Sequence, residues 1–301
     1  MNAAELESKL RTARDCEAWI AAVAAFFTQH GLVFGHGTDN AGDEAYWLLR
    51  HLTGWRDLDW RVAPAADLVP RAVELARQRV ETRKPLAYLL HEAWFAGLKF
   101  FVDERVLVPR SPLAEVIERG FAPWCALRPG DRVLDIGTGS GCIAIAAAHY
   151  CPDVRVDATD ISAAALEVAK VNVAQHGLAD RVGLIAADLF PPGEQRYRVI
   201  VSNPPYVPSA EAATLPPEYR HEPEIGLVSG VSGFDAAERI IRGAAARLTA
   251  DGVLFLEVGA GADAFAAAHP RLPLIAIEFE RGGDGVFVTT AAELEEFLRG
   301  G

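Results

Sequence analysis

From residue 131 onward, short apolar runs alternate with longer amphipathic segments. Short apolar runs between turn residues are typical of buried strands, and longer segments with a helical repeat are typical of helices. The pattern predicts strands at residues 132–136, 154–159, 182–186, 199–202, 253–258, 274–279 and 285–289. It predicts helices at 143–150, 164–176, 233–248 and 262–269. Such alternation predicts an α/β fold, in which a Rossmann-like, seven-stranded, mostly parallel sheet carries helices on both faces.

The last two predicted strands are joined by the turn sequence Arg281-Gly282-Gly283-Asp284. A connection this short fits a hairpin and not a crossover. The last strand is therefore expected to run antiparallel to its neighbours.

The first part of the chain has a different pattern. Apolar residues recur at helical spacing from residue 3 to about 90, and Asp39 and Asn40 precede the segment 43–52, where either can cap a helix. The basic stretch 79–84 is expected to be a solvated helix end. Residues 1–90 are therefore predicted to form a helical N-terminal domain.

Residues 94–108 alternate in a way that is typical of a β-hairpin, with its turn expected at Asp103-Glu104. This hairpin would lie in a linker, 91–112, between the helical domain and an α/β domain over 113–301.

Composition limits the classes of function. The chain has 301 residues, half of them apolar, and a net charge of −12. A protein that wraps duplex nucleic acid needs a basic face, which this charge disfavours. No signal peptide or membrane span is recognisable, so a cytoplasmic protein is expected. The cysteines lack paired metal-ligand spacing and predict reduced thiols without a metal: Cys16, Cys125, Cys142 and Cys151.

A glycine-rich loop, Gly137-Thr138-Gly139-Ser140-Gly141, follows the first predicted strand. Its glycines allow close backbone approach to a ligand, and the next helix directs free N–H groups toward the loop. Dinucleotide-binding loops place their third glycine one residue later, where this chain has Cys142. Asp135, two residues before Gly137, favours a cofactor that carries a positive group and no pyrophosphate.

Further polar residues follow the next predicted strands. Asp160 can accept hydrogen bonds from two ribose hydroxyls, and Asp188 can accept one from an adenine amino group. Their neighbours Ile161 and Leu189 belong to the same candidate cofactor site. Each aspartate alone could instead be a helix cap or a turn residue, but together the acids predict S-adenosylmethionine as the ligand.

The fourth predicted strand ends in Asn203-Pro204-Pro205-Tyr206. Two prolines stop a ladder or helix from continuing, and they leave one amide and one aromatic ring on a stiff turn. Such a pair can hold a planar nitrogen group, either the exocyclic amine of a base or a side-chain carboxamide. The simpler alternative is a strand-terminating turn with a capping asparagine.

These motifs together resemble class I S-adenosylmethionine-dependent methyltransferases, and more closely the protein N(5)-glutamine methyltransferases of the HemK/Prm group. The resemblance spans nearly the whole chain. The segments 34–41, 92–95 and 220–227 resemble the ribosomal-protein branch, PrmB, although Gly42 stands where that branch has tryptophan. The resemblance implies methylation of a glutamine in the third large-subunit ribosomal protein, with S-adenosylhomocysteine as the second product. The alternatives are a release-factor methyltransferase, as in the PrmC branch, and a nucleic-acid adenine-N6 methyltransferase.

The resemblance also implies roles for single residues. Asn203 and the Pro204 carbonyl would accept hydrogen bonds from the two amide N–H groups of the glutamine, and Tyr206 would stack on the amide. Arg110 could hold a substrate backbone carbonyl or form a loop-to-helix ion pair. His221 and Glu222 are further substrate-site candidates. His221 beside Glu222 could form a pair that removes the proton, although His221 also fits a turn residue near the cofactor or substrate groove. The implied partner is a large-subunit ribosomal protein, without a membrane and without sequence-specific nucleic-acid binding. The helical domain over residues 1–90 would recognise this substrate.

Overall fold

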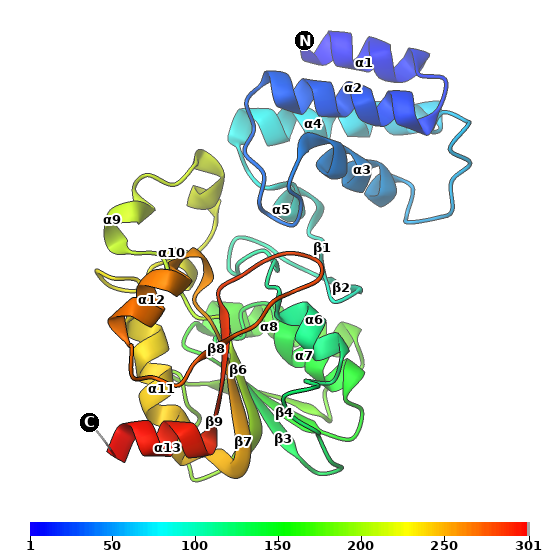
Figure 1. Ribbon diagram of the computed structural model, residues 1–301. Helices are drawn as coiled ribbons and strands as arrows, with labels where there is room; N and C mark the ends of the chain where they lie inside the picture. Colours follow the sequence, from blue (N-terminus) through cyan, green and yellow to red (C-terminus); the bar gives the residue numbers. More distant parts are fainter. Residues whose placement is uncertain (300–301) are drawn as a thin grey trace. The chain divides into compact units, whose positions relative to one another are not determined.

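The computed structural model describes residues 1–299, which divide into two compact units (Figure 1). The helical unit comprises Met1–Glu92 and Pro216–His221, and the sheet unit comprises Ala93–Leu215 and residues 222–299. The predicted boundary after residue 90 therefore lies after Glu92, and the hairpin belongs to the sheet unit. The six residues 216–221 were expected in the α/β domain and instead group with the helices.

The helical unit contains five α-helices and two short 3₁₀ helices within the described residues. They are α1 (Ala3–Thr12), α2 (Cys16–Gln29), α3 (Ala41–Leu52), η1 (Ala66–Leu68), α4 (Val69–Thr82), α5 (Leu86–Leu90) and η2 (Pro217–His221). Asn40 caps α3 as predicted, because its side chain accepts a hydrogen bond from the Asp43 N–H at 2.9 Å. The core between the helices includes the fully buried Trp19, Phe27 and Leu48.

Arg79 departs from the prediction for the helical unit. The stretch 79–84 was expected to be a solvated helix end, but the Arg79 side chain is fully buried. Its guanidinium donates hydrogen bonds to Glu44 Oε1 at 2.6 Å and to the Val33 carbonyl at 3.0 Å. A buried charge with such partners was not visible from local sequence, because Glu44 lies 35 residues away.

The β-hairpin exists, but the prediction of its turn is wrong. Strands β1 (Ala93–Phe95) and β2 (Leu98–Phe100) pair antiparallel around Ala96-Gly97. Both turn residues have positive φ, 49° and 70°, as a two-residue type I′ turn requires. Residues 105–108 form no strand, and the Asp103 carboxylate instead accepts hydrogen bonds from the Arg105 N–H and guanidinium.

The main sheet has the seven strands that the sequence predicts, in the order β5-β4-β3-β6-β7-β9-β8. They are β3 (Arg132–Ile136), β4 (Arg155–Asp160), β5 (Val182–Ala186), β6 (Tyr197–Ser202), β7 (Leu248–Glu257), β8 (Ile275–Ala276) and β9 (Val286–Thr290). The strands from β5 to β7 are parallel, and β9 runs antiparallel to both β7 and β8. The expected antiparallel last strand is therefore confirmed, although β8 has only two residues.

Helices cover both faces of this sheet (Figure 1). They are α6 (Leu113–Glu118), α7 (Cys142–Tyr150) and α8 (Ala163–Gln175) on one face, with α11 (Asp235–Arg247), α12 (Ala262–Ala268) and α13 (Ala291–Arg299) on the other. Alternation along β3 sends Val133 into the first layer and Leu134 and Ile136 into the second. Helix α13 was not predicted, nor were the short α9 (Ser209–Ala212), η3 (Gly259–Gly261) and α10 (Glu224–Leu227).

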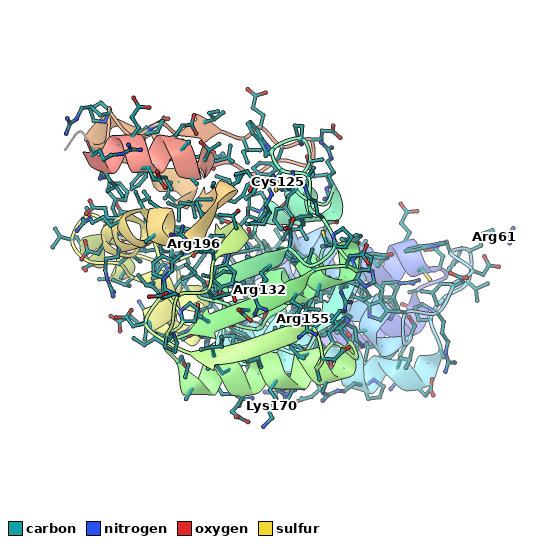
Figure 2. The ribbon with its side chains drawn as sticks, turned by 90° about the horizontal axis from the view of Figure 1, so that it is seen from below. Arg61, Cys125, Arg132, Arg155, Lys170 and Arg196 are labelled. Carbon is teal, nitrogen blue, oxygen red and sulfur yellow. The ribbon has the colours of Figure 1, made fainter. Side chains whose placement is uncertain are left out.

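The beginnings of three strands are joined by one carboxylate. Arg132 and Arg155 lie where β3 and β4 begin (Figure 2), and Arg132 forms an ion pair with Asp157 at 2.7 Å. The Tyr197 hydroxyl at the start of β6 donates to the same carboxylate at 2.8 Å. These contacts fix β3, β4 and β6 against one another, which positions the loops at their other ends.

Within residues 1–299, no helix is long and apolar enough to cross a membrane.

The buried Asn172 of α8 links two loops of the sheet unit. Its Oδ1 accepts from the Phe101 N–H at 2.7 Å, and its Nδ2 donates to the carbonyls of Phe101 and Ser140 at 2.9 and 2.8 Å. Removing a side chain with these bonds leaves buried backbone groups without partners.

We therefore expect Asn172→Ala to lower the free energy of unfolding by about 2–4 kcal/mol, measured by urea denaturation. Gln175→Ala, an exposed position near the end of the same helix, serves as the control and should change stability little. If both variants lowered the free energy of unfolding equally, the Asn172 hydrogen bonds would not be the source of the stabilisation.

Candidate active site

The pairing of β3 with its neighbours brings three strand ends to one edge of the sheet. Ile136 at the end of β3 is paired with Thr159 on β4 and with Ser202 on β6. The Ser202 hydroxyl donates to the Ile136 carbonyl at 2.7 Å. The glycine-rich loop and the Asn203 tetrapeptide therefore start side by side.

A cavity of about 340 Å³ opens at this edge of the sheet unit. It brings together most of the predicted site residues, namely Arg110, Gly137, Thr138, Gly139, Asp160, Ile161, Asp188, Leu189, Asn203, Pro204, Pro205 and Tyr206. Four predicted residues do not line it, namely Asp135, Gly141, His221 and Glu222.

Asp135 lies beneath the glycine-rich loop and not on the cavity wall. Its Oδ2 accepts hydrogen bonds from the Thr138 hydroxyl at 2.6 Å and from the Ala144 N–H at 3.1 Å. Burial raises the pKa of this carboxyl from 3.8 to about 7, and the nearby Asp160 charge adds to the effect. Asp135 was expected to contact a cationic group of a cofactor, but its side chain does not reach the cavity wall. The side chain supports the loop from below.

The loop itself depends on its glycines. Gly137 and Gly139 have φ values of 74° and 54°, which side-chain-bearing residues rarely adopt. Gly141 also has positive φ, and a Cβ there would lie 3.3 Å from the Cβ of Ala169 on α8. Gly141 therefore serves close packing of the loop against α8, which explains why it does not face the cavity.

Asp160 is placed at the end of β4, between the glycine-rich loop and α8. Its Oδ2 accepts from the Gly139 N–H at 2.9 Å, and its Oδ1 accepts from the Ser162 N–H at 2.8 Å. Burial raises the pKa of Asp160, although these backbone hydrogen bonds oppose the shift. Each carboxylate oxygen retains acceptor capacity for a ligand hydroxyl.

Asp188 and Leu189 follow β5 on the cavity wall. The Asp188 carboxylate accepts from Arg239 Nη2 at 2.7 Å, but both side chains are about half exposed, so this pair stabilises little. Leu189 has a φ of 68°, and its carbonyl accepts from the Thr159 hydroxyl at 2.6 Å. That bond fixes the backbone of this loop to β4.

Asn203 offers an unpaired amide to the cavity. Its side chain makes no hydrogen bond to any residue within 1–299 and lines the cavity wall. The simpler interpretation, a capping asparagine, is wrong, because the next helix begins at Ser209 and has Pro208 at its N-cap. Strand β6 ends at Ser202, and the two prolines follow Asn203 directly.

Two glycines that the sequence analysis missed leave room for Tyr206. A Cβ on Gly259 would lie 2.5 Å from Cε2 of the Tyr206 ring, and a Cβ on Gly233 would lie 2.4 Å from the Tyr206 carbonyl oxygen. Both glycines have positive φ. The sequence did hold one indication for Gly259: it follows the apolar run of β7 closely, so it lies at the same edge of the sheet.

Glu222 holds Arg110 in place. Its two carboxylate oxygens accept from Arg110 Nη1 at 2.5 Å and Nη2 at 2.8 Å, and one also accepts from the Val108 N–H at 3.0 Å. Of the two interpretations of Arg110, the ion pair is therefore formed, while Arg110 still lines the cavity. His221 does not pair with Glu222. Its Nε2 lies 2.8 Å from the Thr82 carbonyl in the helical unit.

Glu257, at the end of β7, is a buried acid that the sequence analysis missed. The Ser111 hydroxyl, from a residue that lines the cavity, donates to Glu257 Oε2 at 2.5 Å. Burial raises the pKa of Glu257 to about 7, against the opposing effects of Ser111 and Arg110. The site therefore combines a backbone loop, carboxylates, a free amide and an aromatic ring. Within the described residues, no His, Cys, Asp and Glu side chains are grouped to hold a metal ion.

Comparison with known proteins gives matches at both the family and the sequence level. The family model of the methyltransferase small domain matches residues 124–215. A ribosomal protein uL3 glutamine methyltransferase of Neisseria gonorrhoeae is 45% identical over 276 residues, which cover 89% of this chain and 91% of the relative. The one of Bordetella pertussis is 45% identical over 271 residues, which cover 87% and 90%. A methyltransferase structure from Pyrococcus furiosus is 19% identical, with a TM-score of 0.47 over 65% of this chain and 89% of that chain.

The raised pKa of Asp135 predicts a pH dependence of stability. Between pH 4 and about 7 the folded state binds more protons at this group than the unfolded state, so its contribution to stability falls as pH rises. Asp135→Asn removes this titration and keeps an acceptor oxygen for Thr138 and Ala144. Relative to the native protein, the variant should therefore gain about 2 kcal/mol between pH 5 and pH 7.

Urea denaturation of both proteins at these two pH values, without added ligand, measures this difference. Any fixed cost of burying the new amide shifts both values equally. A stability difference that is the same at pH 5 and pH 7 would contradict the assignment.

Proposed function

We propose that this chain, which belongs to the ribosomal protein uL3 glutamine methyltransferase family, transfers a methyl group from S-adenosylmethionine to the side-chain nitrogen of a glutamine in uL3. The observation that carries the proposal is the free Asn203 amide on the cavity wall, held at the same sheet edge as the glycine-rich loop. An amide that is not used within the protein is available to a planar amide of a substrate.

The residues around the cavity suit the cofactor. The loop Gly137–Gly139 offers backbone to an amino-acid moiety, and Asp160 offers carboxylate oxygens to ribose hydroxyls. Ile161 is 59% exposed at the cavity, and an apolar side chain there suits the face of a purine base. Asp188 stays an acceptor for the adenine amino group, and Asp135 acts through the loop that it supports.

When bound, S-adenosylmethionine supplies an electrophilic methyl group on a sulfonium. The chain must supply orientation, because the amide nitrogen of glutamine is a poor nucleophile whose lone pair is delocalised into its carbonyl. In our proposal Asn203 Oδ1 and the Pro204 carbonyl accept the two amide N–H groups, and Tyr206 stacks on the amide face. Positioning of this kind can lower a barrier by several kcal/mol. The carbon–nitrogen bond forms as the carbon–sulfur bond of the sulfonium breaks, and the amide nitrogen loses one proton to water. The products are N(5)-methylglutamine, S-adenosylhomocysteine and that proton.

The net charge of −12 supports a basic protein substrate and disfavours a nucleic acid. Acidic surfaces steer basic partners during diffusional encounter and repel polyanions. Ribosomal proteins bind RNA and are commonly basic, so uL3 fits this charge. We assign recognition of the protein substrate to the helical unit, and the reaction to the cytoplasm.

Mass spectrometry of purified uL3 after incubation with the protein and S-adenosylmethionine tests the function. The expected result is one added methyl group, which fragmentation places on a glutamine side chain. Asn203→Ala should lower this transfer about 100-fold or more, as removal of a transition-state hydrogen bond does in other enzymes. Affinity for S-adenosylhomocysteine, measured by calorimetry, should stay largely unchanged in this variant.

In parallel, the protein is incubated with release factor, DNA or RNA and with S-adenosylmethionine that carries a tritiated methyl group. Label in release factor but not in uL3 would replace the proposed substrate. Label in nucleic acid alone would overturn protein methylation. Normal turnover by Asn203→Ala would contradict the role given to this amide.

Gly259→Ala should disturb the Tyr206 ring from a position that does not itself line the cavity. The added methyl group would lie 2.5 Å from Cε2 and 2.6 Å from Cζ of the ring, so the ring must move. A displacement of about 1 Å in a positioning group can cost about 100-fold in rate, and we expect a loss of that order in kcat/KM.

Gly177→Ala is the matched control, because Gly177 has a similar φ of 66° and a Cβ added there would have no atom within 4 Å. It shares the backbone cost of about 1–2 kcal/mol but not the steric clash. Equal activity in the two variants would show that the Tyr206 ring position does not matter for turnover.

A further inference from the structure

The residues after Tyr206 form a long excursion whose two ends are tied together at the cavity. We call residues 207–229 the strap. At its root the Val207 N–H donates to the Leu227 carbonyl at 2.8 Å, and the Ser229 N–H donates to the Val207 carbonyl at 3.0 Å. These three root residues line the cavity, and Val207 directly follows Tyr206. Val207 therefore joins the strap root directly to the tetrapeptide that carries Asn203.

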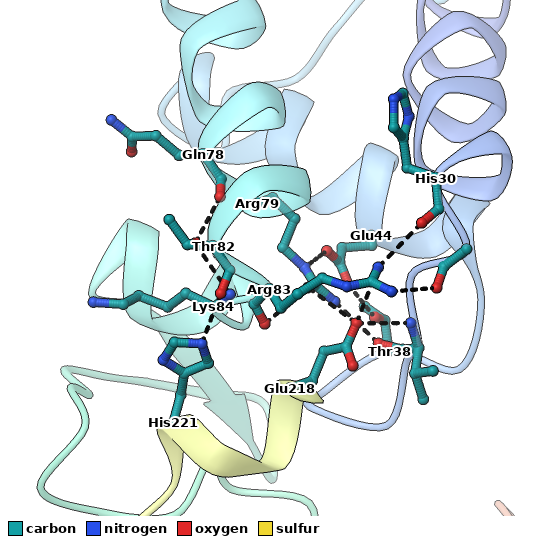
Figure 3. Close-up of polar contacts among 12 residues, drawn as sticks. His30, Thr38, Glu44, Gln78, Arg79, Thr82, Arg83, Lys84, Glu218 and His221 are labelled. Carbon is teal, nitrogen blue, oxygen red and sulfur yellow. Dashed lines mark hydrogen bonds and ion pairs between the residues drawn. The ribbon is translucent and has the colours of Figure 1, made fainter. Parts of the chain in front are cut away.

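The tip of the strap belongs to the helical unit. Residues 216–221 pack there through the Tyr219 ring, whose centroid lies 4.4 Å from that of His36. His221 adds the contact with the Thr82 carbonyl on α4 (Figure 3). The tip is thus held by side chains from two separate parts of the helical unit.

Glu218 at the tip is fully buried, and its side chain makes polar contacts with Val33, Arg79 and Arg83 of the helical unit. Figure 3 shows Glu218 beside the two arginines. Its Oε1 accepts from the Val33 N–H at 3.0 Å. The same oxygen lies 3.7 Å from Arg79 Nη1 and 3.5 Å from Arg83 Nη1. A carboxylate in an ordinary surface loop would stay in water, so this burial marks a specific attachment.

The charges around Glu218 balance only when the tip is in place. The buried Arg79 forms a 2.6 Å ion pair with Glu44, and Arg83 is only partly exposed. Glu44 and Glu218 together therefore face two arginine side chains. Removing one member of a buried ion pair is strongly destabilising, because the remaining charge stays buried without compensation.

Four residues after Glu218, the strap returns to the sheet unit through Glu222. Glu222 binds the Arg110 guanidinium and the Val108 N–H, as described above. Arg110 and Val108 both line the cavity. The return of the strap is therefore tied to cavity residues, as is its root.

We propose that Glu218 is a positioning residue of the methyl transfer. By anchoring the strap tip in the helical unit, it fixes the course of the chain between Tyr206 and Glu222, and thereby the placement of Asn203, Tyr206 and Arg110. The inference rests on the proposed function and extends it, because it gives the helical unit a part in turnover besides binding the protein substrate.

Glu218→Gln tests this role with little change in shape. The glutamine retains an oxygen for the Val33 N–H and loses the charge that Arg79 and Arg83 face. We expect kcat for uL3 methylation to fall about 2- to 30-fold, the range typical of energetic coupling between distant groups. The KM for uL3 and the affinity for S-adenosylhomocysteine should stay within about twofold, since neither ligand touches Glu218 in this scheme.

Tryptic cleavage after the exposed Arg220 provides a second measurement, which reports on the strap directly. It should be faster in Glu218→Gln, because a released tip is accessible to the protease. Glu211→Gln, an exposed position on the same strap, is the matched control and should behave like the native protein in all measurements. All assays are run well below the unfolding temperature of each variant.

Faster cleavage with unchanged kcat would show that the anchor is only structural and would overturn the inference. Unchanged cleavage and unchanged kcat would overturn it as well. Both outcomes leave the proposed function standing, provided that the native protein methylates uL3. If the native protein does not, the proposed function fails first and the inference fails with it.

Discussion

The register between β3 and β6 is the constraint on which the site depends. Ile136 lies opposite Ser202, and the Ser202 hydroxyl is bonded to the Ile136 carbonyl. The next residue on one strand starts the glycine-rich loop, and the next residue on the other is Asn203. A shift of one residue would turn the side chains of a strand to the opposite face of the sheet. The backbone loop and the free amide can meet only in the register observed.

Much of the sheet unit could be predicted from sequence, because buried parallel strands are short apolar runs and the ligand-binding loops follow them. The glycine-rich loop, Asp160 and Asn203 all lie at strand ends as expected. Asp135 shows the limit of this reasoning. Spacing placed a carboxylate near the loop, but only the tertiary structure shows that it lies beneath the backbone and not on the cavity wall. The hairpin turn at Ala96-Gly97 was missed because Ala96, with a left-handed φ, gave no turn signal of its own.

The distant partners of the charged residues could not be predicted from sequence, even where the residues themselves were site candidates, as Arg110 and Glu222 were. Glu222 is 112 residues from Arg110, and Glu218 is 139 residues from Arg79 in sequence. The neighbouring sequence does not distinguish these side chains from solvated charges. For the same reason, the sequence predicts a solvated helix end at Arg79. Gly259 likewise matters because the Tyr206 ring lies against it. Tyr206 follows strand β6, whereas Gly259 follows strand β7, so local sequence does not show the contact.

The two glutamates of the strap differ in how well they are paired. Glu222 accepts three hydrogen bonds, two of them charge-assisted and bidentate with Arg110. Glu218 accepts one backbone hydrogen bond, its arginine contacts are 3.5 Å or longer, and its Oε2 has no hydrogen-bond partner within the described residues. A buried carboxylate with fewer partners recovers less of its desolvation cost. Of the two carboxylates, Glu218 therefore makes the weaker attachment, and the tip depends in addition on the Tyr219 and His221 contacts.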